Sequence, residues 1–588
     1  MILQALYDYY DRRVNSLPPL QMALTNFCYA IVIDENGGFN CIEPLGDVDG
    51  IQLLTFRPEE RTSAPVPHCL GDNGSYVLGL KNVKPDKSFD FTKEMNSNEK
   101  NYSAFVEDVK RLSKDLPNNK YVRAISKFYQ SYGIETVKQM SHDVNWAGLC
   151  NSLSKNITFR VSGEITLAAS DPQVIQYKID RAFNENKEAI CLITGQKAKP
   201  VNTTYSTFIL GGKSNAKLVS FQVSSGYDSY GKKMGLNAPV SEEAEFKYTT
   251  ALLSMLSKGS KNKFIISNRT FLFWASKNDE AGKQVEDSIF NMFGFTDDDD
   301  DPNRRIEQVR KVFSSVYSGS LKTSVDDKFY ILGLAPNSAR IAVTYWSELP
   351  LKEFASLILR HFEDMEIADT RKEKKPYMGL NSMMKAITPP EPDGKVRIYG
   401  IDSKLQPNLP EAVVKSIFQG LPYPFSLFSS CIRRIRAESG KEKDPIDTPR
   451  AAIIKSYLNR LNNNQKTIKV MLDKDNTNHG YLCGRLFAVL DKIQEETNNQ
   501  HSIRERYMNS ASSTPAVVFP TILNLSNHHF DNLKSEGRKI FFERLKQEIL
   551  DKVDADGFKA QLDLQDQGRF FIGYYHQRQD FFLKNNNE

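Results

Sequence analysis

A stretch without periodicity, residues 367–396, constrains the fold of this 588-residue chain more than any other feature. It contains the runs RKEKK, PYMGLNSMM and TPPEPDGK, which bring Pro, Gly and charged residues together with no helical or strand period. β-rich runs alternate with helical patterns before it, whereas helical patterns follow it. The sequence therefore predicts an α+β fold: β-hairpins and helices over residues 1–365, a linker or long loop over 366–400, and an all-α helical bundle over 401–588.

Local patterns support both parts. Residues 27–33 form a β-rich run, the turn-forming segment DENGG follows, and residues 39–42 resume the strand pattern. Two further strand-like runs, 329–334 and 340–346, flank the turn PNS. In the second part, residues 481–496 place their apolar side chains on one helical stripe, which is typical of a helix in a bundle.

The charge of the chain is unevenly distributed. The 77 Lys and Arg residues against 72 Asp and Glu leave a formal charge of only +5, so any surface for nucleic acid must be local. Residues 431–470 contain ten basic and four acidic residues, a local charge of +6. This segment is therefore a candidate electrostatic footprint for nucleic acid.

Several classes of protein are disfavoured. The seven cysteines show no Cys-x-x-Cys spacing, which predicts reduced thiols and a cytoplasmic protein. Neither a cationic start followed by an apolar run nor an apolar stretch of about 18 residues occurs, so neither export nor a membrane is expected. Since glycine-rich nucleotide loops and clustered metal ligands are also missing, we predict no catalytic, metal or cofactor site.

Residues 211–256 combine the side chains that nucleic-acid contact requires. A Gly-Gly pair precedes Lys213, a strand-like run follows, and a loop then supplies hydroxyls, aromatic rings, cations and an amide. The loop residues of interest are Ser225, Tyr227, Lys232, Lys233 and Asn237. Residue chemistry alone leaves open an ordinary surface loop between a strand and a helix.

A second candidate is Asn73, which lies between Gly71 and Gly74 ahead of a predicted strand at 76–79. A small amide at such a position can enter a DNA minor groove and read hydrogen-bond acceptors. The segment Asp-Asn-Gly is also a good tight turn, so the structural reading remains open here too.

Several blocks, in order along nearly the whole chain, resemble one known family. They are MILQALYDYYDR, GDNGSYVLGL, SYGKKMGLNAPVSEEAEFKYTTALL, KFYILGLAPNSARIAVTYW, YLCGRLFAVLDKIQEE, SASSTPAVVFP and FFIGYYHQRQDFF. The chain is similar to the large subunits of the type I-C CRISPR surveillance complex, Cascade.

The resemblance implies a protein that binds nucleic acid without chemistry on it. A guide RNA would read the target by base pairing, while the large subunit recognises a short flanking motif in duplex DNA, the PAM, and starts unwinding into an R-loop. The implied partners are target DNA and its displaced strand, the guide ribonucleoprotein with its backbone, processing and small subunits, and a recruited helicase-nuclease. The C-terminal bundle would resemble the small subunit.

The resemblance also suggests roles for individual residues. The expected PAM-duplex contacts are Gly71, Asn73, Gly74, Lys213, Ser225, Tyr227, Lys232, Lys233 and Asn237. The expected contacts to the displaced strand are Arg433, Arg434, Arg436, Lys455 and Arg485. Met471 would be an internal start from which the small subunit is made separately. The alternatives are a nuclease or guide-processing enzyme, and an architectural subunit that does not read DNA.

Overall fold

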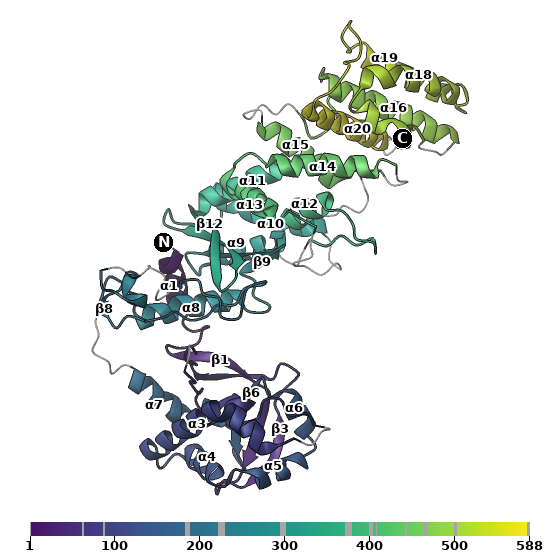
Figure 1. The fold of residues 1–588 in the computed structure, drawn as a ribbon. Helices are drawn as coiled ribbons and strands as arrows, with labels where there is room; N and C mark the ends of the chain where they lie inside the picture. The colour runs from purple at the N-terminus through teal and green to yellow at the C-terminus, as the bar shows by residue number, and fades with distance from the viewer. Residues whose placement is uncertain are drawn as a thin grey trace. The chain divides into compact units, whose positions relative to one another are not determined.

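The computed structural model describes most of the chain, and the fold below concerns only those parts. They are residues 2–61, 64–85, 89–182, 189–221, 228, 230–293, 302–370, 379–398, 404–406, 408–440, 444–461, 468–498 and 502–584. The chain forms two compact units (Figure 1). Unit 1 comprises residues 3–207 and 217–254, and unit 2 comprises 208–216 and 255–588.

A four-stranded sheet organises unit 1, in the order β3-β2-β6-β5. The strands are β2 (Tyr29–Ile33), β3 (Phe39–Pro44), β5 (Gly71–Asn73) and β6 (Asn156–Val161). The predicted hairpin at 27–42 is confirmed, because β2 and β3 pair antiparallel. Its turn depends on Asp34, whose Oδ1 accepts hydrogen bonds from the amides of Asn36 and Gly38, both at 2.8 Å.

Helices cover this sheet, and unit 1 also contains a two-stranded sheet of β1 (Met22–Phe27) and β4 (Ile51–Phe56). Ile31, Phe128 and Phe159 are buried with Val122 and Leu112 in one core between strands and helices. The other elements of unit 1 include α1 (Ile2–Arg12), α3 (Phe91–Asp115), α4 (Lys120–Ser131), α5 (Ile134–Ser141), α6 (Trp146–Asn151), α7 (Pro172–Ala182) and α8 (Glu242–Leu256).

The predicted strand at 76–79 is wrong. Residues Gly74–Val77 form a one-turn helix, α2, directly after β5. The Asn73 side chain accepts a hydrogen bond from the amide of Ser75, and this N-cap bond favours a helical start over continued strand. The turn chemistry of Asp-Asn-Gly therefore ends the strand rather than starting one.

Unit 2 is built on an antiparallel sheet in the order β12-β11-β10-β9. The strands are β9 (Lys263–Ile266), β10 (Arg269–Ala275), β11 (Lys328–Asn337) and β12 (Arg340–Pro350), so the two predicted runs near 329–346 pair with each other. Alternate residues such as Phe271, Phe273 and Phe329 point into the core. Helices α9 (Glu280–Phe293), α10 (Pro302–Ser318) and α11 (Leu351–Met365) contribute to that core.

The remaining chain of unit 2 is helical. Its elements are α12 (Leu380–Ile387), α13 (Leu409–Gln419), α14 (Phe425–Glu438), α15 (Thr448–Leu461), α16 (His479–Asn498), α17 (Ser502–Ala511), α18 (Pro515–Asp531), α19 (Glu536–Leu550) and α20 (Leu564–Lys584). With 51% helix and 14% strand, the chain is α+β as predicted. The core is continuous from the sheet to α20, and α12 folds within residues 366–400. The linker or long loop over 366–400 and the domain boundaries on either side of it stay predictions. Among the described helices, not one is both long and apolar enough to cross a membrane.

Glycines allow α16 and α20 to approach closely (Figure 1). A Cβ at Gly484 would lie 1.9 Å from the carbonyl oxygen of Phe570, and one at Gly573 would lie 2.2 Å from that of Tyr481. The two backbones thus pack directly on each other at this crossing. A methyl group at Gly484 or Gly573 would force the helices apart.

We therefore expect Gly484→Ala to loosen the C-terminal helices. The clash should lower their local stability by about 3 kcal/mol, within the range known for overpacked cores. Gly537→Ala is the matched control, because the nearest atom to its Cβ would be Ser535 Oγ at 3.7 Å and alanine favours a helix.

Hydrogen exchange measures both effects locally. Gly484→Ala should reduce protection in α16 and α20 and leave α3 of unit 1 unchanged, whereas Gly537→Ala should retain or increase protection in α19. Equal protection of α16 in the wild type and in Gly484→Ala would contradict the close packing.

Candidate nucleic-acid interface

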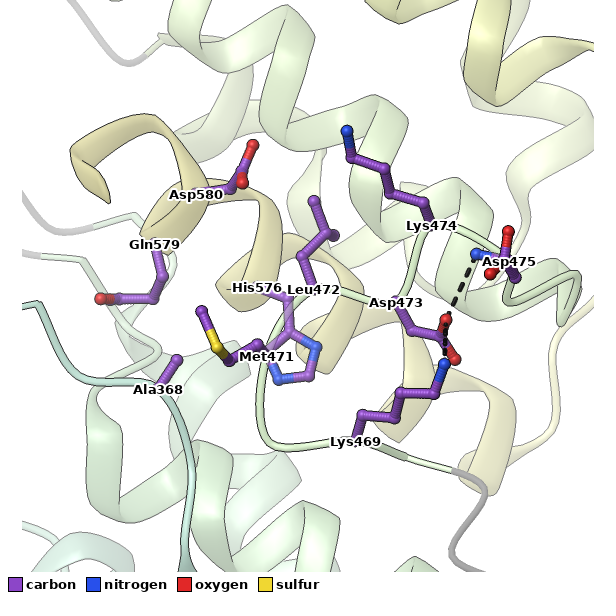
Figure 2. Close-up of a pocket in the computed structure, with 10 residues that line it drawn as sticks. All are labelled: Ala368, Lys469, Met471, Leu472, Asp473, Lys474, Asp475, His576, Gln579 and Asp580. Carbon is purple, nitrogen blue, oxygen red and sulfur yellow. Dashed lines mark hydrogen bonds and ion pairs between the residues drawn. The ribbon is translucent and has the colours of Figure 1, made fainter. Parts of the chain in front are cut away.

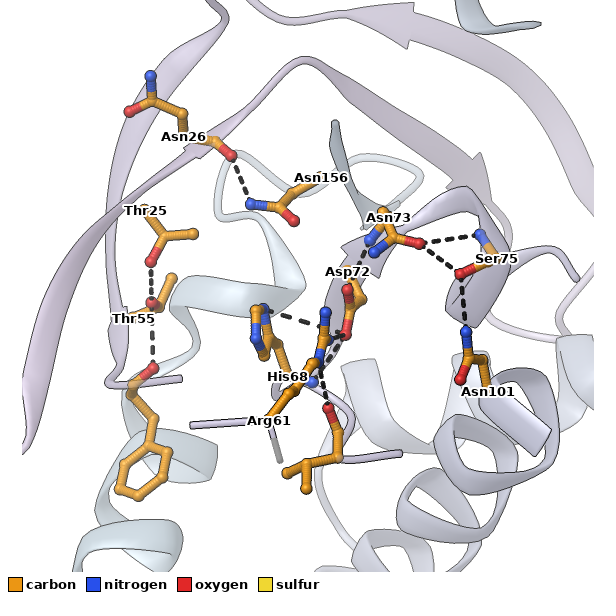
Figure 3. Close-up of polar contacts among 12 residues, drawn as sticks. Thr25, Asn26, Thr55, Arg61, His68, Asp72, Asn73, Ser75, Asn101 and Asn156 are labelled. Carbon is orange, nitrogen blue, oxygen red and sulfur yellow. Dashed lines mark hydrogen bonds and ion pairs between the residues drawn. The ribbon is translucent and has the colours of Figure 1, made fainter. Parts of the chain in front are cut away.

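Asn73 lies where β5 ends and α2 begins, and its carboxamide is held in place (Figure 3). Its Oδ1 accepts hydrogen bonds from the amide of Ser75 at 3.1 Å and from the Ser75 hydroxyl at 2.6 Å. Asn101 of α3 in turn donates to the Ser75 hydroxyl at 3.2 Å. The side chain itself is half-buried. Asn73 is thus a partly accessible amide on a structured turn.

The two neighbouring glycines are buried and hold this turn in place. A Cβ at Gly71 would lie 2.6 Å from the Phe27 ring, and one at Gly74 would lie 2.7 Å from the carbonyl oxygen of Leu80. Gly74 also donates its amide to the carbonyl of Leu153 at 2.8 Å. Since neither glycine reaches the surface, the structure places them as supports of Asn73 rather than as contacts of their own.

A buried carboxylate anchors the loop that leads into β5. Asp72 is fully buried and accepts hydrogen bonds from its own neighbour, the Asn73 amide, at 2.7 Å and from the His68 amide at 3.0 Å. The Arg61 guanidinium pairs with the same carboxylate and lies 4.2 Å from the centre of the Tyr76 ring. These bonds satisfy a charge that would otherwise be costly to bury.

His68 beside this carboxylate is shifted toward its neutral form. Burial lowers the pKa of His68 from 6.5 to about 4, and it outweighs the Asp72 carboxylate, which acts in the opposite direction. The Nδ1 atom lies 4.0 Å from Asp72 Oδ2, too far for a hydrogen bond. His68 is therefore neutral at physiological pH.

The loop before α8 is held from within. Asp228 Oδ1 accepts hydrogen bonds from the Asn237 side chain at 2.8 Å and from the Met234 amide at 3.2 Å. Gly235 packs so closely that a Cβ would lie 1.9 Å from the carbonyl oxygen of Val201. Asn237 thus serves in this structure as an internal clamp of the loop, formed by Met234–Asn237 (η2) and the residues before it.

The side chains displayed by this loop are cationic and aromatic. Lys232 and Lys233 are exposed, and in the described part of the chain their ammonium groups have no partner. Tyr230 is fully exposed with a φ of +53°, next to Gly231 at +73°. Tyr230 is absent from the predicted contacts, although the run SYGKK, with an aromatic residue beside glycine and two lysines, is a signal for it. Ser225 and Tyr227 lie outside the described residues.

Lys213 belongs to unit 2, not to the unit that carries the loop before α8. It is exposed, and its amide donates to the carbonyl of Ser338 at 3.4 Å in the turn between β11 and β12. Lys213 lies in the 208–216 segment of unit 2, whereas Lys232 and Lys233 belong to unit 1.

Three arginines of α14 remain near the surface of unit 2. Arg433 is exposed and donates to Ser430 Oγ at 2.8 Å. Arg436 is half-buried and donates to Gln567 at 2.6 Å, whereas Arg434 forms an ion pair with Glu438. Arg433 is therefore the most available of the three for a phosphate.

Lys455 and Arg485 do not lie on the surface. Lys455 is 3% exposed and donates to the carbonyl of Asp364 at 2.9 Å, and Arg485 is 0% exposed and pairs with Glu548 at 3.0 Å. Both cations are engaged inside unit 2, so contact with a displaced strand is not available to them in this structure.

A pocket of about 290 Å³ lies between helix α20 and the segment 469–475, which precedes α16 (Figure 2). Its lining mixes cations and carboxylates, among them Lys469 and Asp473, which pair at 2.8 Å. Met471, half-exposed, and the buried His576 also line it. Across the described residues, no group of three or more His, Cys, Asp or Glu is arranged to hold a metal ion.

Comparison with known families matches residues 6–582 to the family described as CRISPR-associated protein (Cas_Csd1). No curated protein matches the chain significantly. The family match covers nearly the whole chain and confirms the resemblance found in the sequence blocks.

The shift of His68 predicts an acid-sensitive turn at β5 and α2. Below pH 6.5 the unfolded state takes up a proton that folded His68 accepts only near pH 4, so stability falls as the pH falls. At pH 5 the loss amounts to about 2 kcal/mol relative to pH 7. His68→Gln removes this contribution. Between pH 7 and pH 5 the variant should therefore lose about 2 kcal/mol less stability than the wild type.

Hydrogen exchange of the β5 and α2 amides at pH 7 and pH 5, corrected for intrinsic rates, measures this difference. His142→Gln is the control, because His142 is exposed at the end of α5. The same pH dependence in the wild type and in His68→Gln would contradict the assignment.

Proposed function

The chain belongs to the CRISPR-associated Cas_Csd1 family, the large subunits of type I-C Cascade, and we propose that it recognises the PAM in double-stranded target DNA. It then promotes unwinding and R-loop formation and helps to recruit the helicase-nuclease for antiviral defence. In this proposal it acts by binding alone, while the guide RNA reads the target by base pairing.

The observation that carries the proposal is the exposed side-chain set of the loop before α8. Tyr230, Lys232 and Lys233 project from a segment held by Asp228 and Gly235. Ammonium groups on a held backbone can bind phosphates, and an exposed ring can stack on a base. Asn73 adds an amide for base edges, with Gly71 and Gly74 as its supports. Lys213, an exposed cation of unit 2, stays a separate proposed contact.

The arginines of α14 support a second contact, to the displaced strand. Arg433 and Arg436 are one helical turn apart and therefore lie on the same side of α14. In the proposal they bind successive phosphates of the displaced strand, and Arg434 contributes where its ion pair with Glu438 opens.

Removal of the two loop cations should weaken DNA binding regardless of sequence. Lys232→Ala with Lys233→Ala, in the guide-loaded complex, should lower affinity about tenfold and reduce the slope of log K against log salt by about 2, because each phosphate contact contributes about 0.9. Lys110→Ala with Lys114→Ala is the charge-matched control from exposed positions of α3.

Binding is compared at fixed salt on matched duplexes that differ only in the flanking motif, with and without this chain. PAM discrimination only in the chain's presence supports the proposal, whereas discrimination in its absence places the reader in another subunit. Unchanged affinity in the double variant favours the architectural alternative.

We also propose that Met471 is an internal start for a separate small subunit. A product of residues 471–588 contains α16 to α20, in which α16 packs on α17, α18, α19 and α20. The crossing of α16 and α20 therefore lies entirely within the fragment. The fragment would lose its cover from α15, including the 3.0 Å bond between Thr448 and Tyr575.

Met471→Leu tests this start without a large structural change, since the side chain is 52% exposed. Expression of the intact gene with a C-terminal tag should give a full-length band and a short band, and the variant should lose only the short band. Met508→Leu, in α17, should keep both bands. A wild-type gene that yields full-length product alone would contradict the internal start.

A further inference from the structure

The orientation of the Asn73 carboxamide follows from its partners. A carboxamide carries an acceptor, Oδ1, and a donor, Nδ2, whose positions are interchangeable in shape. The Ser75 amide can only donate, so the Asn73 atom 3.1 Å from it must be Oδ1. Nδ2 is therefore the other branch of the carboxamide.

Ser75 and Asn101 reinforce this orientation. The Asn101 amide donates to Ser75 Oγ at 3.2 Å, and an amide nitrogen cannot accept in return. The single proton of the Ser75 hydroxyl is thus free to point at Asn73 Oδ1, 2.6 Å away. Two donors converge on the oxygen, and rotation of the carboxamide by 180° would break both bonds.

Side chains from α3 and from the end of α4 bind the main chain shortly after Asn73. Tyr129 donates to the carbonyl of Val77 at 2.8 Å, and Tyr132 donates to that of Leu78 at 2.7 Å. The Asn98 side chain donates a hydrogen bond to the next carbonyl, that of Gly79, at 3.1 Å. The end of α2 is therefore bonded to α3 and α4, which fixes Asn73 at its start.

The free branch faces away from these bonds. Within the part of the chain that the structure describes, Nδ2 of Asn73 has no hydrogen-bond partner, and the side chain is half-buried rather than enclosed. We infer that Ser75 and Asn101 are positioning residues that present Asn73 as a donor only, and so make it selective for hydrogen-bond acceptors in the DNA minor groove. This inference rests on the proposed function in PAM recognition.

The selectivity follows from the groove chemistry. A·T and T·A pairs present only acceptors in the minor groove, whereas a G·C pair adds the guanine amino group, which is a donor. An unrestrained asparagine could turn its oxygen toward that amino group. Here the oxygen is occupied by Ser75, so the guanine amino group would meet another donor and remain unpaired.

Base analogues test the inference without changing the protein. In duplexes with a fixed guide-paired region, each flanking base pair is altered in turn: 2,6-diaminopurine for adenine adds a minor-groove amino group, and inosine for guanine removes one. The wild-type guide-loaded complex should lose about tenfold in affinity at one position when the amino group is added, the cost of one unpaired hydrogen bond. We call the affinity for the adenine duplex divided by that for the diaminopurine duplex the diaminopurine ratio. Asn73→Ala should reduce this ratio to about one.

Protein variants test the positioning residues. Ser75→Ala and Asn101→Ala should each bring the diaminopurine ratio closer to one. Ser75→Thr keeps a hydroxyl and should leave the ratio unchanged. Ser103→Ala, at an exposed site of α3, is the control. Because the ratio compares two DNAs on the same complex, a loss of stability or of overall affinity does not change it.

The possible failures are distinguishable. If the complex discriminates between flanking motifs but no analogue changes binding at any position, the inference is wrong and the proposed function stands. If the Asn73 variant loses the ratio while Ser75→Ala and Asn101→Ala keep it, these two residues do not position the amide. If the complex does not discriminate between motifs at all, the proposed function itself fails.

Discussion

At Gly484 a methyl group would lie 1.9 Å from the carbonyl oxygen of Phe570, so α16 and α20 meet as they do only because backbone packs directly on backbone. The same constraint acts at Gly235, 1.9 Å from the carbonyl oxygen of Val201, and at Gly74, 2.7 Å from that of Leu80. Backbone in such contact cannot shift without losing packing on both sides. Residues next to these glycines, Asn73 among them, are therefore presented from held positions.

Burial decides which cations can act on a partner. The charge of residues 431–470 suggests a broad basic surface, yet Arg450, Lys455 and Arg460 lie within unit 2. Arg460 pairs at 2.6 Å with Asp364, and Lys455 is bonded to main-chain carbonyls. A buried charge is tolerated only with such partners, so these residues are committed to the fold. Among the described residues of 431–470, the candidate surface for nucleic acid is therefore smaller than the charge count suggests, and Arg433 is its most exposed arginine.

Sequence patterns predicted the elements whose signals are local and failed where tertiary burial decides. The hairpin at 27–42 follows from a β-rich run and turn residues, and both are visible in the sequence. Lys455, predicted to contact the displaced strand, is buried, and the mostly apolar run AAIIKSYL around it is the sequence signal of a helix buried on nearly all sides. The one-turn helix α2 is too short for periodicity, and only the capping preference of asparagine indicates it. Tyr230 is fully exposed, and the run SYGKK, in which it stands beside glycine and two lysines, is the local signal that indicates it.

In the proposed function, affinity and selectivity come from different residues. Phosphate contacts by lysine supply attraction that is nearly independent of sequence, and one neutral hydrogen bond contributes only about 1 kcal/mol. A reader so weak would be inadequate for a protein that had to find its site alone. It is sufficient when a guide RNA supplies the remaining specificity, because the flanking motif has only to bias where unwinding begins. An asparagine whose oxygen is already occupied suits that task, since it keeps one polarity of hydrogen bond and cannot adapt to the wrong base pair.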